Sequence, residues 1–194
     1  MGNRLYIGLR DSGKTTSLYQ DVGDALLARR PVVVIDSATE HMDRSLLHRL
    51  LRGCAHDCVG GEFPRTAADP RQRLYQMILP ADAGKIVMID VSYYLEEGHR
   101  LTDPDEKLTI RRHYQDEASE VMATVHSIML RGGLRKVLVA MDEIEYTGCI
   151  ASYAKAIAEY GGEVHAALHP PFVANELFGE FEYVNLTRRG KQYD

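Results

Sequence analysis

Eight residues near the start of the chain, Gly8 to Thr15, are of the types and at the spacing that a phosphate-binding loop requires. They read Gly-Leu-Arg-Asp-Ser-Gly-Lys-Thr and match the pattern G-x-x-x-x-G-K-[ST] at every fixed position. In such a loop the backbone N–H groups point into one concavity, and the N-terminus of the following helix adds partial positive charge. Gly8 and Gly13 permit close turns, Lys14 reaches the β- and γ-phosphates, and Thr15 ligates Mg²⁺. We therefore predict a nucleotide site built from Gly8, Arg10, Asp11, Ser12, Gly13, Lys14, Thr15 and Thr16.

The segments around this loop are those expected to position it. The apolar strand Leu5-Tyr6-Ile7 precedes the loop, and a helical stretch, Thr16 to Arg29, follows it. Further apolar runs bounded by breakers suit strands buried on both faces of a parallel sheet. We expect strands at Arg4 to Gly8, Pro31 to Asp36, Lys85 to Val91, Lys136 to Glu143, Glu163 to Leu168 and Phe181 to Leu186. We expect the other helices at Met42 to Arg52, Gln72 to Leu79, Thr109 to Leu130 and Ile150 to Tyr160.

This alternation of strands and helices predicts the fold class. It indicates an α/β protein with three layers and a mostly parallel central sheet. In such folds ligands gather at the carboxyl ends of the strands. We see no repeat or linker that divides the chain, and we expect a single domain over residues 1–194.

A phosphate loop needs a second acidic group to hold Mg²⁺, at the end of a neighbouring buried strand. Two strands qualify, one ending at Asp90 and the other at Asp142. Asp90 is followed by Val91, whereas Asp142 is followed by Glu143. An Asp–Glu pair divides the work, because the Asp can support the metal while the Glu polarises a water for attack on the γ-phosphate. We therefore predict Asp142 as the metal ligand and Glu143 as the catalytic base.

Composition limits the remaining possibilities. The chain has 194 residues and a formal net charge of −5, so no overall basic field draws it to nucleic acid or to anionic lipid. We find no apolar run of the roughly 18–20 residues that cross a bilayer, and no signal peptide. Three cysteines, an odd number, favour a reducing compartment. We expect a cytoplasmic protein.

Four further segments, taken in their order along the chain, are similar to those of a known class of proteins. After the phosphate loop come Val34 to His41, Gly84 to Ser92, Val137 to Ile144 and Ala167 to Pro171. In this order they resemble the FtsK/HerA class of P-loop ATPases, which pump DNA and whose segments read "viDp.gE", "g.v.viDls", "llvlDEa" and "aTQrP". The resemblance covers nearly the whole chain and implies a P-loop NTPase fold of RecA-like (ASCE) type that binds ATP and Mg²⁺.

The resemblance also implies an assembly. Members of this class work as rings, usually hexamers, with ATP between subunits, and a neighbour supplies an arginine to the transition state. Arg188 and Arg189 are the preferred candidates for that arginine, ahead of Arg111 and Arg112. The Gln that senses the γ-phosphate in this class is replaced by His169, which can donate or accept a hydrogen bond.

The expected partner is double-stranded DNA, contacted at its phosphates because a motor must accept any sequence. Candidate contacts are Arg100, Lys107, Arg111 and Arg112, while Arg10 would approach the nucleotide or line a subunit contact. A core of this length resembles the genome-packaging ATPases of membrane-containing viruses. That likeness implies a capsid portal or a membrane component as docking partner, and a place in host cytoplasm or at a virion vertex.

Two other functions stay open. A small-molecule or nucleotide kinase would use Asp90 for the metal, Glu96 to Arg112 as a lid, and Arg111 and Arg112 to clamp phosphates. A nucleotide-dependent switch with negligible turnover is the second. The guanine-reading motif N-K-x-D does not occur, which favours ATP over GTP.

Overall fold

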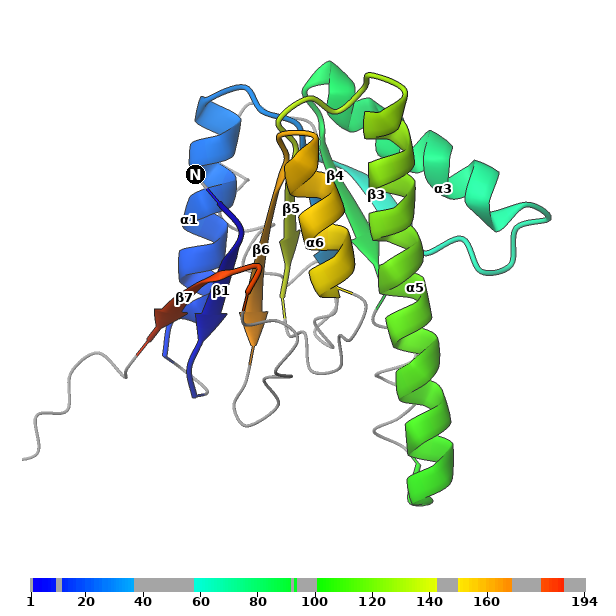
Figure 1. Ribbon diagram of the computed structural model, residues 1–194. Helices are drawn as coiled ribbons and strands as arrows, with labels where there is room; N and C mark the ends of the chain where they lie inside the picture. Colours follow the sequence, from blue (N-terminus) through cyan, green and yellow to red (C-terminus); the bar gives the residue numbers. More distant parts are fainter. Residues whose placement is uncertain are drawn as a thin grey trace, which may run out of the picture.

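The protein is described by a computed structural model at residues 2–9, 12–36, 58–91, 93, 101–142, 150–168 and 179–186. Strands and helices alternate along these residues (Figure 1). The strands are β1 (Arg4–Ile7), β2 (Val32–Asp36), β3 (Cys58–Glu62), β4 (Ile86–Asp90), β5 (Leu138–Met141), β6 (Glu163–Leu168) and β7 (Glu182–Asn185). The helices are α1 (Lys14–Leu27), α3 (Pro70–Ile78), the short 3₁₀ helix η2 (Leu79–Ala83), α5 (Pro104–Leu130) and α6 (Ile150–Glu159).

The seven strands form one sheet in the order β3-β4-β2-β5-β6-β1-β7, and every neighbouring pair is parallel. Helix α1 covers one face of the sheet, and α3, α5 and α6 lie on the other (Figure 1). The fold is therefore three-layered α/β with an all-parallel sheet, compatible with the RecA-like P-loop type. The predicted fold class is confirmed.

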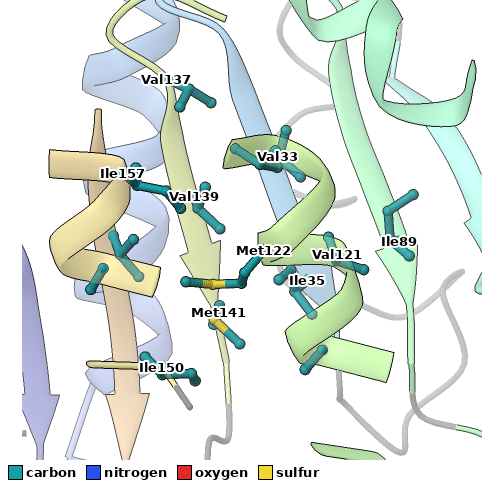
Figure 2. Packing of buried hydrophobic residues seen from close by; sticks show 14 of the residues in the cluster. Val33, Ile35, Ile89, Val121, Met122, Val137, Val139, Met141, Ile150 and Ile157 are labelled. Atoms are coloured by element: carbon teal, nitrogen blue, oxygen red, sulfur yellow. The ribbon is translucent and has the colours of Figure 1, made fainter. Parts of the chain in front are cut away.

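The strands are apolar because both faces of the sheet are covered. All five residues of β2, all four of β5 and all six of β6 are buried. On the face that carries α5 and α6, Val33 and Ile35 of β2 meet Met122 of α5, and Val139 of β5 lies beside Ile157 of α6 (Figure 2). A second cluster lies under α1, where Leu18 and Val22 pack on the alternate strand residues, those that point to the other face of the sheet.

Helix starts follow capping chemistry. Helix α3 is capped by Asp69, whose side chain accepts from the backbone N–H of Gln72, and has Pro70 in its first turn. Helix α5 is capped in the same way by Asp103, with Pro104 in its first turn. Asp103 to Asp105 could be a turn or a helix start from the sequence, and this cap makes them the start of α5, five residues before the helical pattern begins at Thr109. Its first half extends past the carboxyl ends of the strands (Figure 1, lower part).

The structure corrects one prediction and leaves another outside its range. Residues Cys58–Glu62, which are not among the strands predicted from the sequence, form strand β3 beside β4. Gly60 and Gly61 lack the side chains that make a strand visible in sequence. The helix expected at Met42 to Arg52 lies outside the described residues.

Candidate nucleotide-binding site

The phosphate loop lies between the end of β1 at Ile7 and the start of α1 at Lys14, as predicted. One backbone contact ties the start of the loop to a neighbouring strand, and another closes a turn within it. Gly8 N–H points to the carbonyl of Leu168, the last residue of β6, at an N···O distance of 3.5 Å. Within the loop, Ser12 N–H donates to the carbonyl of Leu9 at 3.2 Å. The loop thus sits at the carboxyl edge of the sheet, where ligands bind in parallel α/β folds.

Both glycines of the motif have a steric reason. A Cβ on Gly8 would come 2.3 Å from Ser12 Oγ and 2.7 Å from the carbonyl oxygen of Leu186, far inside contact distance. Gly13 has open space around it but adopts φ of 90°, a left-handed conformation in which a side chain is strained. The backbone of the loop therefore depends on glycine at both positions.

The N-terminus of α1 differs from those of α3 and α5. Its cap residue is Gly13, no side chain caps it, and no acidic residue lies in its first turn. The first N–H groups of a helix have no partner within the helix, and they carry the positive end of the helix dipole. Among the described residues, no side chain occupies these donors at α1, whereas Asp69 and Asp103 occupy them at the other two helices, so the α1 donors are suited to an anion.

Two polar side chains of the loop are buried. Lys14 is buried, and its ammonium donates a hydrogen bond to the carbonyl of Leu9 at 2.9 Å, so it lies over the loop. Ser12 is 7% exposed, and its Oγ has no hydrogen-bond partner among the described residues. A buried hydroxyl without a hydrogen-bond partner destabilises a folded protein. Both groups have the chemistry to contact phosphate oxygens.

The contact that defines the site joins the loop to the residue that follows β5. Thr15 Oγ1 donates a hydrogen bond to Asp142 Oδ1 at 3.3 Å, across 127 residues of sequence. Asp142 follows β5 directly and is 5% exposed. The structure therefore brings together the two residues predicted to ligate Mg²⁺.

Strand order explains why Asp142, and not Asp90, meets the loop. One strand, β6, lies between β1 and β5, whereas β6, β5 and β2 all separate β1 from β4. At about 4.8 Å per strand, Asp142 is about 10 Å across the sheet from the strand that leads into the loop, and Asp90 about 19 Å. The charge of Asp90 instead influences the pKa of Glu117 on α5. Burial raises the pKa of Glu117, Arg65 opposes that rise, and the charge of Asp90 adds to it.

A further carboxylate, Asp36, lies next to Asp142. Strands β2 and β5 pair with Ile35 opposite Met141, so Asp36 and Asp142 are level at the carboxyl edge. Alternation along each strand directs both side chains toward the face that carries α1. Asp36 is 3% exposed. The sequence predicted no chemical role for Asp36, because only strand pairing places it beside Asp142, the predicted metal ligand.

The remaining predicted residues divide into two groups. Thr16 is exposed in the first turn of α1, and Lys107 and Arg112 lie on the first half of α5, at the same edge of the sheet as the loop. The other predicted positions lie outside the described residues: Arg10, Asp11, Arg100, Glu143, His169, Arg188, Arg189 and the side chain of Arg111. Glu143 and His169 directly follow Asp142 and the end of β6, respectively.

Comparisons with known proteins add no family to this geometry: no protein-family model matches the chain, and no curated protein matches its sequence. Among the described residues, no group of three or more His, Cys, Asp or Glu side chains is arranged to hold a metal by itself. A metal at Thr15 and Asp142 would therefore need ligands from the nucleotide and from water, as is usual for Mg²⁺. Within the same part of the chain, no helix is both long and apolar enough to cross a membrane.

Proposed function

We propose that the chain is a Mg²⁺-dependent ATPase that works as an oligomeric motor on double-stranded DNA. The observation that carries the ATPase is the hydrogen bond from Thr15 to Asp142. It pairs a hydroxyl at the start of α1 with a carboxylate at the end of β5, which lies two places from β1 in the sheet. Both groups are oxygen ligands of the kind that Mg²⁺ takes.

The residues of the loop fit a triphosphate. Gly8 and Gly13 keep Cβ atoms out of the loop, the first turn of α1 offers uncapped N–H groups, and Ser12 Oγ lacks a partner among the described residues. In this proposal Lys14 leaves the carbonyl of Leu9 to hold the β- and γ-phosphates. Thr15 and Asp142 hold the metal, which when bound neutralises charge that develops on the phosphate oxygens.

The second half of the chemistry falls to residues at neighbouring strand ends. Glu143 follows Asp142 and would accept a proton from the attacking water. His169 follows β6, the strand between β1 and β5, so it is suited by position to report the γ-phosphate. Arg188 or Arg189 would enter the site of a neighbouring subunit and stabilise transition-state charge.

The motor part of the proposal is supported by the resemblance to the FtsK/HerA class. In the preferred form of the proposal, the chain assembles into a ring that packages a viral genome. Rings of that class are usually hexamers. Lys107 and Arg112 belong to the first half of α5. That half of the helix extends past the carboxyl ends of the strands, at the edge that carries the loop (Figure 1). Cations there could contact DNA phosphates at the same edge of the sheet as the proposed nucleotide site. The kinase alternative would instead place the metal on Asp90 at the end of β4, and three strands separate β4 from the strand that enters the loop.

The test is ATP hydrolysis by the purified chain with Mg²⁺ or with EDTA, and with or without duplex DNA. We expect hydrolysis that requires Mg²⁺, rises with DNA, and is lost in Lys14→Ala. Sizing with nucleotide should detect a ring. Transfer of phosphate to a nucleoside or small metabolite would favour the kinase instead, and a slow rate that DNA does not raise would favour a switch.

A further inference from the structure

A buried carboxylate on α1 is bound from three directions. Asp21 accepts hydrogen bonds from Arg4 Nη1 at 3.0 Å, from the hydroxyl of Tyr6, and from His165 Nδ1 at 2.6 Å. Its side chain is 12% exposed, and that of His165 is 4% exposed. Burial by itself raises the pKa of Asp21, but the hydrogen bonds from His165 and Tyr6, together with the charges of His165 and Arg4, outweigh it, so the pKa is lowered and the carboxylate is held ionised.

The three donors come from two strands. Arg4 and Tyr6 belong to β1, and His165 belongs to β6, directly opposite Arg4 in the sheet. His165 Nε2 also lies 3.2 Å from the carbonyl of Gly2, which ties the start of the chain to the same point. Asp21 therefore fixes α1 to the strand that enters the phosphate loop and to the next strand of the sheet.

This point of attachment is close behind the loop. Asp21 is seven residues after Lys14, two helical turns or about 10 Å along α1. Tyr6 is two residues before Gly8. The strand that enters the loop and the helix that leaves it are thus joined through one carboxylate. A shift of α1 along the sheet would move Thr15 relative to Asp142.

An ionic contact is not needed to hold α1 on the sheet. Leu18 and Val22 already bury fully against it, one turn before and one residue after Asp21. Replacing a buried ion pair by apolar residues is often neutral or stabilising. What a carboxylate with three fixed donors adds is a single allowed register, because apolar contacts permit sliding and oriented hydrogen bonds do not.

We infer that Asp21 is a positioning residue for the phosphate loop, which sets α1 so that the loop can bind nucleotide and Thr15 can meet Asp142. The inference rests on the proposed function, since it concerns the same site. Asp21 acts through α1 and makes no contact with the ligand.

The test compares Asp21→Asn with a matched control, Glu163→Gln. Glu163 has the same side-chain exposure, 12%, lies 3.5 Å from His165 Nε2 and pairs with Arg30 at 3.0 Å, but it is on β6 and touches neither α1 nor β1 by any of these contacts. Binding of fluorescent ADP with Mg²⁺ gives the dissociation constant, and circular dichroism gives the melting temperature. Tyr6→Phe, which removes one donor and keeps the ring, is a milder variant that serves if Asp21→Asn does not fold.

We expect Asp21→Asn to weaken Mg²⁺–ADP binding about ten-fold or more, as loss of a supporting shell does elsewhere. Tyr6→Phe should have a smaller effect in the same direction. Glu163→Gln should lower the melting temperature and leave the dissociation constant near that of the unsubstituted chain.

Each other outcome overturns the inference. Normal binding by Asp21→Asn and Tyr6→Phe would mean that the carboxylate has no part in positioning. Equal weakening in Asp21→Asn and Glu163→Gln, in proportion to their melting temperatures, would mean a structural role only. If the unsubstituted chain bound no nucleotide, the proposed function would fail and this inference with it, whereas the first two results leave the proposed function standing.

Discussion

Thr15 and Asp142 are held together by one hydrogen bond of 3.3 Å between a hydroxyl and a carboxylate oxygen. If both are metal ligands, the hydroxyl is essential and the methyl group of Thr15 is not. Thr15→Val keeps the shape of the side chain and should lower Mg²⁺-dependent hydrolysis about a hundred-fold or more, as does loss of a single transition-state contact elsewhere. Thr15→Ser should retain most of the rate. A steady-state ATPase assay distinguishes them, and equal rates in the two variants would exclude metal ligation by Thr15.

Glu143 offers a different test, because its proposed role is in proton transfer and not in binding. Glu143→Gln keeps the size of the side chain and removes the base. We expect turnover to fall by about 10² to 10⁴, the range for general-base catalysis, while ATP binding persists. Equilibrium binding and single-turnover hydrolysis should be measured on the same sample. Near-normal hydrolysis by this variant would remove Glu143 from the mechanism.

Much of the fold could be predicted from local sequence, for reasons visible in particular strands. β2 and β4 lie inside a sheet covered on both faces, so their residues are almost all apolar and stand out as runs. β3 escaped prediction because Gly60 approaches β4 so closely that a Cβ would come 1.8 Å from the Met88 carbonyl oxygen. The requirement for glycine there is set by a neighbouring strand and carries no local strand signal.

The candidate site divides in the same way. The phosphate loop is a continuous motif. The rule that parallel strands end at one edge allowed both Asp90 and Asp142 as its partner, and Glu143 beside Asp142 decided between them. Asp36 and Asp21 could not be predicted. Asp36 adjoins Asp142 through strand pairing, and Asp21 meets His165 across 144 residues. Such contacts depend on tertiary register, which no local pattern encodes.

Gly8 gives a prediction about sterics. Gly8→Ala should destabilise the protein by about 1–3 kcal/mol, the usual cost of overpacking, and should impair nucleotide binding. Adding Ser12→Ala should not restore it, because the carbonyl oxygen of Leu186 stays 2.7 Å from the new Cβ. Gly23→Ala, in open space on α1, is the control and should stabilise the helix by about 0.5–1 kcal/mol. Full rescue by the double substitution would show that Ser12 alone, and not the carbonyl of Leu186, excludes a Cβ at Gly8.

The ion pair between Arg65 and Glu117 tests how burial sets the value of a charge. Arg65 donates two hydrogen bonds to Glu117, at 2.8 and 2.9 Å, and the side chains are 17% and 7% exposed. Glu117→Ala leaves a largely buried guanidinium and should cost about 3 kcal/mol of unfolding free energy. The pair of Arg71 and Glu120 is as close, at 2.6 Å, but Arg71 is 81% exposed.

Because that second pair is screened by solvent, Glu120→Ala should cost less than about 1 kcal/mol. Denaturant unfolding of both variants gives the two values directly. Similar losses in the two variants would contradict this account of burial.

The lowered pKa of Asp21 predicts how stability depends on pH. In the unfolded chain this carboxyl titrates near its ordinary value of about 3.9. Since the pKa is lower in the folded state, the unfolded chain takes up the proton first as pH falls, and the stabilising contribution is lost on passing down through the folded pKa. The unfolding free energy of the unsubstituted chain should therefore exceed that of Asp21→Asn by a constant amount above about pH 5.

Below that pH the difference should shrink steadily, because Asn cannot titrate and the carboxylate loses its charge. Denaturant curves between neutral and strongly acidic pH provide the measurement. A difference that widened with acid would place the folded pKa of Asp21 above its unfolded value, and would mean that Arg4, Tyr6 and His165 do not stabilise its charge.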